Sequence, residues 1–390
     1  MEPVAIGIIG CGVISESYLR GAAASRLIRI KSIADVRMEA AEARARDFGV
    51  EAVSVESLLG DPDIEIVLNL TVPLVHAQVS RQIIAAGKHV YSEKPLATEF
   101  ADARALVEAA DARGVRVGSA PDTFLGASHQ ACRRLIDEGR IGKIVAGSAA
   151  FMNRSSASWH TNPGFFLFKK GGGPMLDMGP YYVTQLVNLL GPVARVTAVT
   201  SNQMPVREVM TGPLKGSIIR MEVPATFNSV MQFESGANLA ITTSWEVHKH
   251  TRPPFELYGT EGSLIVPDPN FFGGLPRFTR EDGDWQELQI DEHPFGKPTR
   301  TAGNGERVAD YRMVGVIDMA AAIRENRPHR ASADLALHVL EVLESFGRSS
   351  DEGRHVAMTT RCERPAPVPL GEGEEVFLTA EQDTARRRAV

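Results

Sequence analysis

The first third of the chain alternates between two hydrophobic patterns. Short and nearly continuous apolar runs predict strands that are buried on both faces, as in a parallel sheet. Stretches between them that are rich in helix-forming residues predict helices, several of which stop at a glycine. The predicted strands are Val4–Ile9, Ile28–Asp35, Ile64–Leu70, His89–Ser92 and Val115–Gly118, and the predicted helices are Ser17–Ala24, Met38–Phe48, Val75–Ala86 and Ala101–Ala112. This alternation predicts a doubly wound parallel sheet with right-handed crossovers.

The pattern changes after about Pro121. A further helix is followed by runs of strand composition and hairpin-like turns, which predict a large, mostly antiparallel open sheet. The predicted strands are Ile144–Met152, Ala194–Ser201, Thr226–Phe233, Asn238–His248, Glu256–Val266 and Gln286–Ile290, and the predicted helices are His129–Glu138, Tyr311–Asn326 and Asp334–Ser349. We therefore expect an α/β protein with a nucleotide-binding domain at 1–122, a substrate-binding and oligomerisation domain at 123–355, and a proline-rich tail at 356–390 that lies over the surface or is partly disordered.

Composition narrows the class of protein. The 390 residues suit two domains, and 43% hydrophobic with 23% charged residues is typical of a globular chain. A net charge of −6 argues against a nucleic-acid partner. Three distant cysteines form no disulfide framework, and no apolar run reaches the ~18 residues that would span a membrane. The first residues also lack a signal-peptide pattern, so we expect a cytoplasmic protein with no membrane partner.

A glycine-rich turn directly follows the first predicted strand and opens the first helix. The turn reads Gly10-Cys11-Gly12-Val13-Ile14-Ser15. Gly10 permits the tight turn, Gly12 lets the backbone approach a pyrophosphate at the helix N-terminus, and the small Ser15 allows close helix–strand packing. Asp35 ends the next strand about 20 residues later, where a carboxylate can bind an adenosine ribose. The spacing predicts a dinucleotide-binding site; a purely structural glycine turn is the alternative.

The choice of dinucleotide depends on two residues. A carboxylate at Asp35 would repel the 2′-phosphate of NADP, which favours NAD. Arg37 could instead pair with that phosphate, or it could be an ordinary exposed side chain. NAD is the predicted cofactor, with NADP left open.

Two further motifs carry candidate chemistry. Glu93-Lys94-Pro95 follows a strand at the edge of the sheet where such folds bind ligands, although a surface ion pair is the alternative. Gly171-Gly172-Gly173 precedes a predicted helix on which Asp177 and Tyr181 would share one face. A phenol and a carboxylate together can move a proton to or from a hydroxyl group. Without such a role, the glycines would cap a helix that carries two ordinary surface residues.

Substrate and metal sites are less sharply marked. A polar segment from Asn153 to Asn162 contains Trp159 and His160, and aromatic plus polar side chains are typical of a sugar pocket. An exposed loop is the alternative for this segment. The histidines show no HExxH or other metal-ligand spacing, so we expect no metal site.

Together these motifs resemble the glucose–fructose oxidoreductase / inositol dehydrogenase / MocA (Gfo/Idh/MocA) family of NAD(P)-dependent oxidoreductases. The resemblance runs from about Val4 to Gly353 and depends on the GxGxxS turn, the EKP tripeptide and the GGG-x-x-x-D-x-G run at Gly171–Gly179. It implies an N-terminal Rossmann domain followed by an α/β domain with a large open sheet. It also implies a homodimer or homotetramer, commonly packed sheet to sheet.

The resemblance also implies roles for individual residues. Lys94 would contact both substrate and nicotinamide, and Asp177 would bind the substrate. Many members carry a catalytic histidine four residues after that aspartate, whereas this chain has Tyr181, with Tyr182 as the alternative phenol. Cofactor contacts are expected from Glu93 and from Thr71, Pro73 and His76. The segment that holds the last three departs from the usual TPN-x-x-H pattern, because its proline comes one position later.

The sequence thus predicts an NAD-dependent dehydrogenase that acts on a secondary hydroxyl of a sugar, cyclitol or glycoside. Lys94 would orient the hydroxyl and Tyr181 would accept its proton. Two alternatives stay open: an NAD-dependent glycosidase that oxidises the sugar only transiently, and a non-catalytic NAD-sensing regulatory protein.

Overall fold

The computed structural model describes residues 2–378, apart from positions 155, 159, 161, 165–166, 282 and 302–304. Its first sheet has six parallel strands in the order β3-β2-β1-β4-β5-β6. The strands are β1 (Val4–Ile9), β2 (Ile28–Ala34), β3 (Glu51–Ala52), β4 (Ile66–Asn69), β5 (His89–Ser92) and β6 (Val117–Ser119). The predicted doubly wound sheet is confirmed. Its strand order reverses between β1 and β4, and ligands bind beyond the carboxyl ends of the strands at such a point.

Helices follow these strands at nearly the predicted positions. They are α1 (Ser15–Ala23), α2 (Met38–Phe48), α3 (Val55–Gly60), α4 (His76–Ala85) and α5 (Phe100–Arg113). Helices α2 and α5 end at Gly49 and Gly114, whose φ angles of 66° and 69° lie in the left-handed region that glycine adopts without strain. The sequence did not predict β3 and α3, because two and six residues are too short to show a period.

The second sheet has nine strands in the order β16-β15-β14-β13-β7-β12-β11-β8-β19. They are β7 (Ile144–Met152), β8 (Val193–Ser201), β11 (Thr226–Phe233), β12 (Asn238–Ser244), β13 (Phe255–Gly259), β14 (Gly262–Val266), β15 (Arg277–Arg280), β16 (Gln286–Glu287) and β19 (Val356–Ala357). Among the described strands of this sheet only β7 and β12 pair in parallel, so the prediction of a mostly antiparallel sheet is confirmed. The predicted strand 256–266 is in fact the hairpin β13–β14, and β12 stops at Ser244, short of the predicted His248.

Two small hairpins complete the strands. They are β9 (Val206–Glu208) with β10 (Ile218–Arg220), and β17 (Arg300–Thr301) with β18 (Arg307–Val308).

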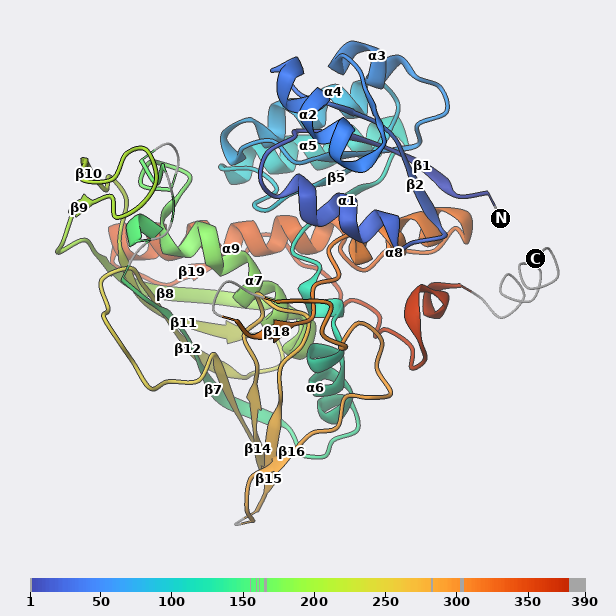
Figure 1. Cartoon of the computed structure of the whole chain (residues 1–390). Helices are drawn as coiled ribbons and strands as arrows, with labels where there is room; N and C mark the ends of the chain where they lie inside the picture. Colours follow the sequence, from blue (N-terminus) through green and yellow to red (C-terminus); the bar gives the residue numbers. More distant parts are fainter. Residues whose placement is uncertain are drawn as a thin grey trace.

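The second half of the described chain also forms four long helices. They are α6 (Ala127–Asp137), α7 (Gly173–Leu190), α8 (Val314–Arg324) and α9 (Ala333–Glu352). Helices α7 and α9 pack on each other and on the large sheet, where alternate residues of β11 such as Met231 and Phe233 are buried. Figure 1 shows α9 running between the large sheet and the blue and cyan N-terminal elements. Leu340 of α9 accordingly packs in the core of the first sheet, while Leu343 packs in that of the second.

Candidate active site

The glycine turn lies between β1 and α1. Gly10 has a φ of 106°, and a Cβ atom there would lie 2.6 Å from the carbonyl carbon and oxygen of Leu70. A Cβ atom at Gly12 would meet no atom within 4 Å, so open space lies beside this residue. Ile14 caps α1 without a side-chain hydrogen bond, and the N–H groups of Ser15 and Ser17 donate to the carbonyl oxygens of Gly12 (3.2 Å) and Ile14 (3.1 Å). The positive end of the helix dipole at this N-terminus favours an anion. The turn therefore fits a pyrophosphate group.

Asp35 lies at the carboxyl end of β2, next to this turn. Its carboxylate accepts hydrogen bonds from the backbone N–H groups of Cys11 (2.8 Å) and Arg37 (2.9 Å). The Arg37 side chain is 75% exposed, with its Nε 3.9 Å from the Asp35 carboxylate. Nearby, Ser15 is buried and donates to the carbonyl oxygen of Gly12 (2.6 Å), while Val13 is exposed. The structure thus brings the predicted nucleotide residues of β1, α1 and β2 together.

A pocket with a cavity volume of about 260 Å³ opens where the glycine turn, the EKP tripeptide and the start of α7 meet. It is lined by Ile14, Thr71, Pro73, His76, Glu93, Lys94, Pro95, Leu167, Gly171, Gly172, Leu176, Asp177 and Tyr181. All three predicted catalytic residues and half of the predicted cofactor contacts therefore face one space. Leu167 and Leu176 add apolar walls that no sequence motif marks.

Lys94 links the two predicted catalytic motifs. Its Nζ donates to the Asp177 carboxylate (2.9 Å) and to the Asp177 backbone carbonyl (2.6 Å), and it lies 5.1 Å from the centroid of the Tyr181 ring. Burial disfavours the charged lysine, but the negative charge of Asp177, with Tyr181 and Glu93, outweighs it and raises the pKa of Lys94. Lys94 is therefore a permanent cation at the pocket wall.

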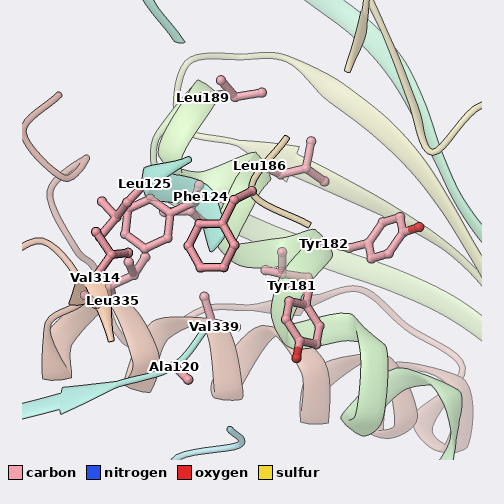
Figure 2. Packing of buried hydrophobic residues seen from close by; sticks show 14 of the residues in the cluster. Ala120, Phe124, Leu125, Tyr181, Tyr182, Leu186, Leu189, Val314, Leu335 and Val339 are labelled. Atoms are coloured by element: carbon pink, nitrogen blue, oxygen red, sulfur yellow. The ribbon is translucent and has the colours of Figure 1, made fainter. Parts of the chain in front are cut away.

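The two adjacent tyrosines of α7 have different surroundings. Figure 2 shows their rings pointing in different directions from the helix. Tyr181 lines the pocket, whereas Tyr182 lies between Phe151 and Phe255, with ring centroids 6.0 and 4.9 Å away. Burial raises the pKa of Tyr182 well above its usual range. Of the two phenols, Tyr181 is the one placed for chemistry in the pocket.

Arg312, a residue that the sequence analysis did not single out, approaches Tyr181 from behind the pocket. Its Nη2 donates to the Tyr181 hydroxyl oxygen (3.3 Å), and its Nη1 lies 3.9 Å from the carboxylate of Glu93. Glu93 is itself buried and accepts hydrogen bonds from the Tyr18 hydroxyl (2.8 Å) and the Lys94 N–H (2.9 Å). Nothing in the local sequence around Arg312 signals this contact, because its partners lie far away along the chain.

His76 connects the two loops that form the other side of the pocket. It is buried, and its ring nitrogens lie 2.7 Å from the Pro95 carbonyl oxygen and 3.0 Å from that of Thr71. Burial lowers the pKa of His76 despite these two acceptors, so the ring is neutral and donates to one of them. Thr71 in turn donates to Asn69 at the end of β4 (2.6 Å). His76 therefore holds the loops in place from behind.

The described residues of the predicted substrate segment are not among those that line the pocket. The Asn153 N–H donates to the Ser244 carbonyl (3.0 Å), and the His160 ring accepts from the Asn162 N–H (3.0 Å). Trp159 is outside the described residues. The contribution of this segment to substrate binding stays a prediction.

The described residues contain neither a metal-ligand cluster nor a membrane-spanning helix. No group of three or more His, Cys, Asp or Glu side chains there could hold a metal ion. No helix of that part of the chain is long and apolar enough to cross a membrane.

Similar proteins carry both halves of this architecture. Residues 4–120 match the oxidoreductase family with an NAD-binding Rossmann fold, and residues 129–265 match the GFO/IDH/MocA C-terminal domain. The 1,5-anhydro-D-fructose reductase of Ensifer adhaerens is 32% identical over 66% of this chain and 74% of its own. A dTDP-3,4-didehydro-2,6-dideoxy-alpha-D-glucose 3-reductase of Streptomyces violaceoruber is 30% identical over 82% of this chain and 92% of its own.

A solved structure shares the whole fold. Levoglucosan dehydrogenase, in a complex with NADH and L-sorbose, superimposes with a TM-score of 0.77 at 22% identity and covers 92% of this chain and 99% of its own. The predicted family and the predicted NAD-binding Rossmann domain are thereby confirmed. The chain belongs to the Gfo/Idh/MocA family of NAD-binding oxidoreductases.

Proposed function

We propose that this protein is an NAD-dependent dehydrogenase that oxidises a secondary hydroxyl of a sugar, cyclitol or glycoside. The observation that carries the proposal is the arrangement of Lys94, Asp177 and Tyr181 around one pocket that also borders the nucleotide loops. A cation, a carboxylate and a phenol meet at one point in this pocket. These are the groups needed to bind a neutral hydroxyl and to remove its proton.

The residues around the glycine turn fit NAD. The backbone at Gly12, Val13 and Ile14 would hold its pyrophosphate and Asp35 its adenosine ribose, with Thr71 and Pro73 beside the nicotinamide half. When bound, NAD supplies the acceptor for the hydride. The Asp35 carboxylate would repel the 2′-phosphate that NADP carries and NAD lacks, so we infer a preference for NAD over NADP.

The chain's own residues supply binding and proton transfer. The Lys94 ammonium carries three N–H donors, so it can bind a substrate hydroxyl while keeping its bonds to Asp177. Tyr181 would accept the proton of that hydroxyl, since its phenol lines the pocket and its ring centroid lies 5.1 Å from the Lys94 ammonium. Asp177 would accept a hydrogen bond from a neighbouring hydroxyl. Leu167 and Leu176 would pack against the apolar face of a ring and exclude water.

The substrate class is proposed from relatives and from the pocket lining. The two similar enzymes named above are reductases of sugar derivatives. The pocket itself mixes a few charged groups with apolar walls, which suits a polyhydroxylated ring. The homodimeric or homotetrameric state and the cytoplasmic location stay predictions.

The test presents sugars, inositols and glycosides together with NAD and then NADP, and follows both reduced nicotinamide and any released aglycone. We expect sustained NADH formation with at least one polyol or sugar, faster with NAD than with NADP. Release of a free sugar from a glycoside without net NADH would overturn the proposal in favour of the NAD-dependent glycosidase. Tight NAD binding with no turnover of any compound would favour the sensing protein instead.

A further inference from the structure

In the hydrogen bond between Arg312 and Tyr181, the donor and the acceptor are fixed. A guanidinium group has only donors, so in the 3.3 Å contact the Tyr181 oxygen is the acceptor. The hydroxyl proton of Tyr181 must therefore point away from Arg312. The guanidinium carbon also lies 5.9 Å from the centroid of the Tyr181 ring. Arg312 thus approaches the same phenol that Lys94 approaches at 5.1 Å on the pocket side.

We propose that Arg312 is a positioning residue for the reaction: it holds the Tyr181 hydroxyl as a proton acceptor and stabilises its phenolate form. The proposal rests on the proposed function, in which Tyr181 deprotonates the substrate. Arg312 does not line the pocket, so it would act through Tyr181 and not on the substrate directly. A phenol in the role of proton acceptor needs such a partner, because an unperturbed phenol stays protonated near neutral pH and only its phenolate form accepts a proton.

The surroundings hold Arg312 firmly in this place. Its side chain is only 11% exposed, and its backbone carbonyl packs so closely on α1 that a Cβ atom at Gly21 would lie 1.9 Å from it. The next residue, Met313, has a φ of 95°, a conformation that is unfavourable for a non-glycine residue and persists only where its surroundings enforce it. A strained residue next to the guanidinium is in keeping with a functional role for this turn.

Two cations approach Tyr181, and the charge of Arg312 is less closely paired than that of Lys94. On the pocket side, Lys94 is paired with Asp177 at 2.9 Å. Behind the pocket, Arg312 faces the carboxylate of Glu93 at 3.9 Å, and its Nη1 makes no hydrogen bond to the described residues. Glu93 is shared with Tyr18 and with the Lys94 N–H.

Two more buried groups influence Arg312 from neighbouring elements. Asp122 and Tyr18 both favour its charged form, and burial raises the pKa of Asp122 to about 6. Burial opposes the charge on Arg312, but Tyr181, Glu93, Tyr18 and Asp122 outweigh it and raise the pKa of Arg312 well above its usual range. Arg312 therefore stays charged throughout the working pH range.

The first test measures the ionisation of Tyr181 directly and needs no substrate. Near-ultraviolet absorbance of phenolate is followed during an alkaline titration, and the Tyr181 signal is the difference between a protein and its Tyr181→Phe counterpart. We expect Arg312→Gln to move this signal to higher pH by about one unit or more, and Arg312→Lys to move it much less. Glu93→Gln should move it to lower pH, because a nearby negative charge is removed.

The second test measures steady-state kinetics with a substrate identified by the screen of sugars, inositols and glycosides. We expect Arg312→Gln to lower kcat by about 10- to 100-fold with little change in KM or in NADH affinity, and Arg312→Lys to recover most of the loss. Arg324→Gln, at the far end of α8, is the matched control and should leave kcat unchanged. An unshifted Tyr181 signal in Arg312→Gln would overturn the proposal. Because that titration works without turnover, a failure to find any substrate would count against the proposed function alone.

Discussion

At the residue scale, the pair formed by Lys94 and Asp177 decides what the pocket can bind. Both side chains are largely buried, at 16% and 18% exposure, so water screens their interaction only weakly. Truncation of one partner would leave the other as an uncompensated charge at the pocket wall. The pair is therefore a fixed dipole in the pocket, with the lysine's remaining N–H donor available to a substrate oxygen.

Removal of the lysine should abolish most activity while leaving the nucleotide site intact. We expect Lys94→Ala to lower kcat/KM by about 100-fold or more, because the group that orients the substrate hydroxyl is lost. NADH affinity, followed by fluorescence, should change by less than about threefold. Lys215→Ala, an exposed lysine of the β9–β10 hairpin, is the control. A Lys94→Ala protein with wild-type kcat/KM would contradict the assigned role.

The carboxylate of Asp35 sets the nucleotide preference in the same local way. Asp35→Ser removes the charge that repels a 2′-phosphate and frees Arg37, whose Nε lies 3.9 Å from the carboxylate, to meet that phosphate. We expect the ratio of NAD to NADP efficiency to fall by about 10-fold or more, the scale of a 1.4 kcal/mol change. Adding Arg37→Ala to this variant should weaken NADP again; an unchanged ratio would show that specificity resides elsewhere.

At the element scale, the two glycines of the β1–α1 turn have different roles: Gly10 is needed for the fold and Gly12 for nucleotide binding. Gly10→Ala places a Cβ atom 2.6 Å from the backbone of Leu70 at a φ of 106°, so it should destabilise the fold by about 1–3 kcal/mol. Gly12→Ala meets no atom within 4 Å and should leave stability nearly unchanged, yet weaken NADH binding, because the methyl group occupies the space for the pyrophosphate. Denaturant unfolding and NADH titration of both variants check this. Equal stability losses would refute the distinction.

The elements that could be predicted from the sequence are those with a local signal. Val4–Ile9 and Met38–Phe48 were predicted to the residue, because an unbroken apolar run and a glycine stop signal mark them. The parallel pairing of β7 with β12 could not be predicted, since it joins residues about 90 positions apart and leaves no mark on either strand. Lys94, Asp177 and Tyr181 were found through motif spacing, whereas Arg312 reaches Tyr181 only through the tertiary fold.

At the scale of the whole molecule, α9 connects the two sheets and also anchors the chain that follows it. Its Glu341 accepts hydrogen bonds from the backbone N–H groups of Thr359 and Thr360 (2.8 Å each) and from both hydroxyls (2.5 Å each). These contacts fix the segment after β19, in which Cys362 and Val368 are buried. The described part of the tail is thus packed against the body of the protein.

This anchor should give the folded state a pH-dependent stability. Burial alone would raise the pKa of Glu341, but the four hydrogen bonds outweigh it and hold the pKa below its usual value of about 4.5. A carboxyl group with a lowered folded-state pKa stabilises the fold above its unfolded-state pKa, and that contribution is lost as the pH falls through the folded-state pKa. Glu341→Gln should therefore lower the free energy of unfolding by about 1–3 kcal/mol at neutral pH.

The same variant should differ less and less from the wild type in acid. As the pH falls below about 4.5 and through the lower folded-state pKa, the wild-type carboxyl becomes protonated and resembles the neutral amide, so the two denaturation curves should converge. Glu352→Gln, an exposed position at the end of the same helix, should show no comparable difference at any pH. A gap between Glu341→Gln and wild type that stays constant from neutral to acid pH would mean that packing, and not the charge of Glu341, holds the tail on α9.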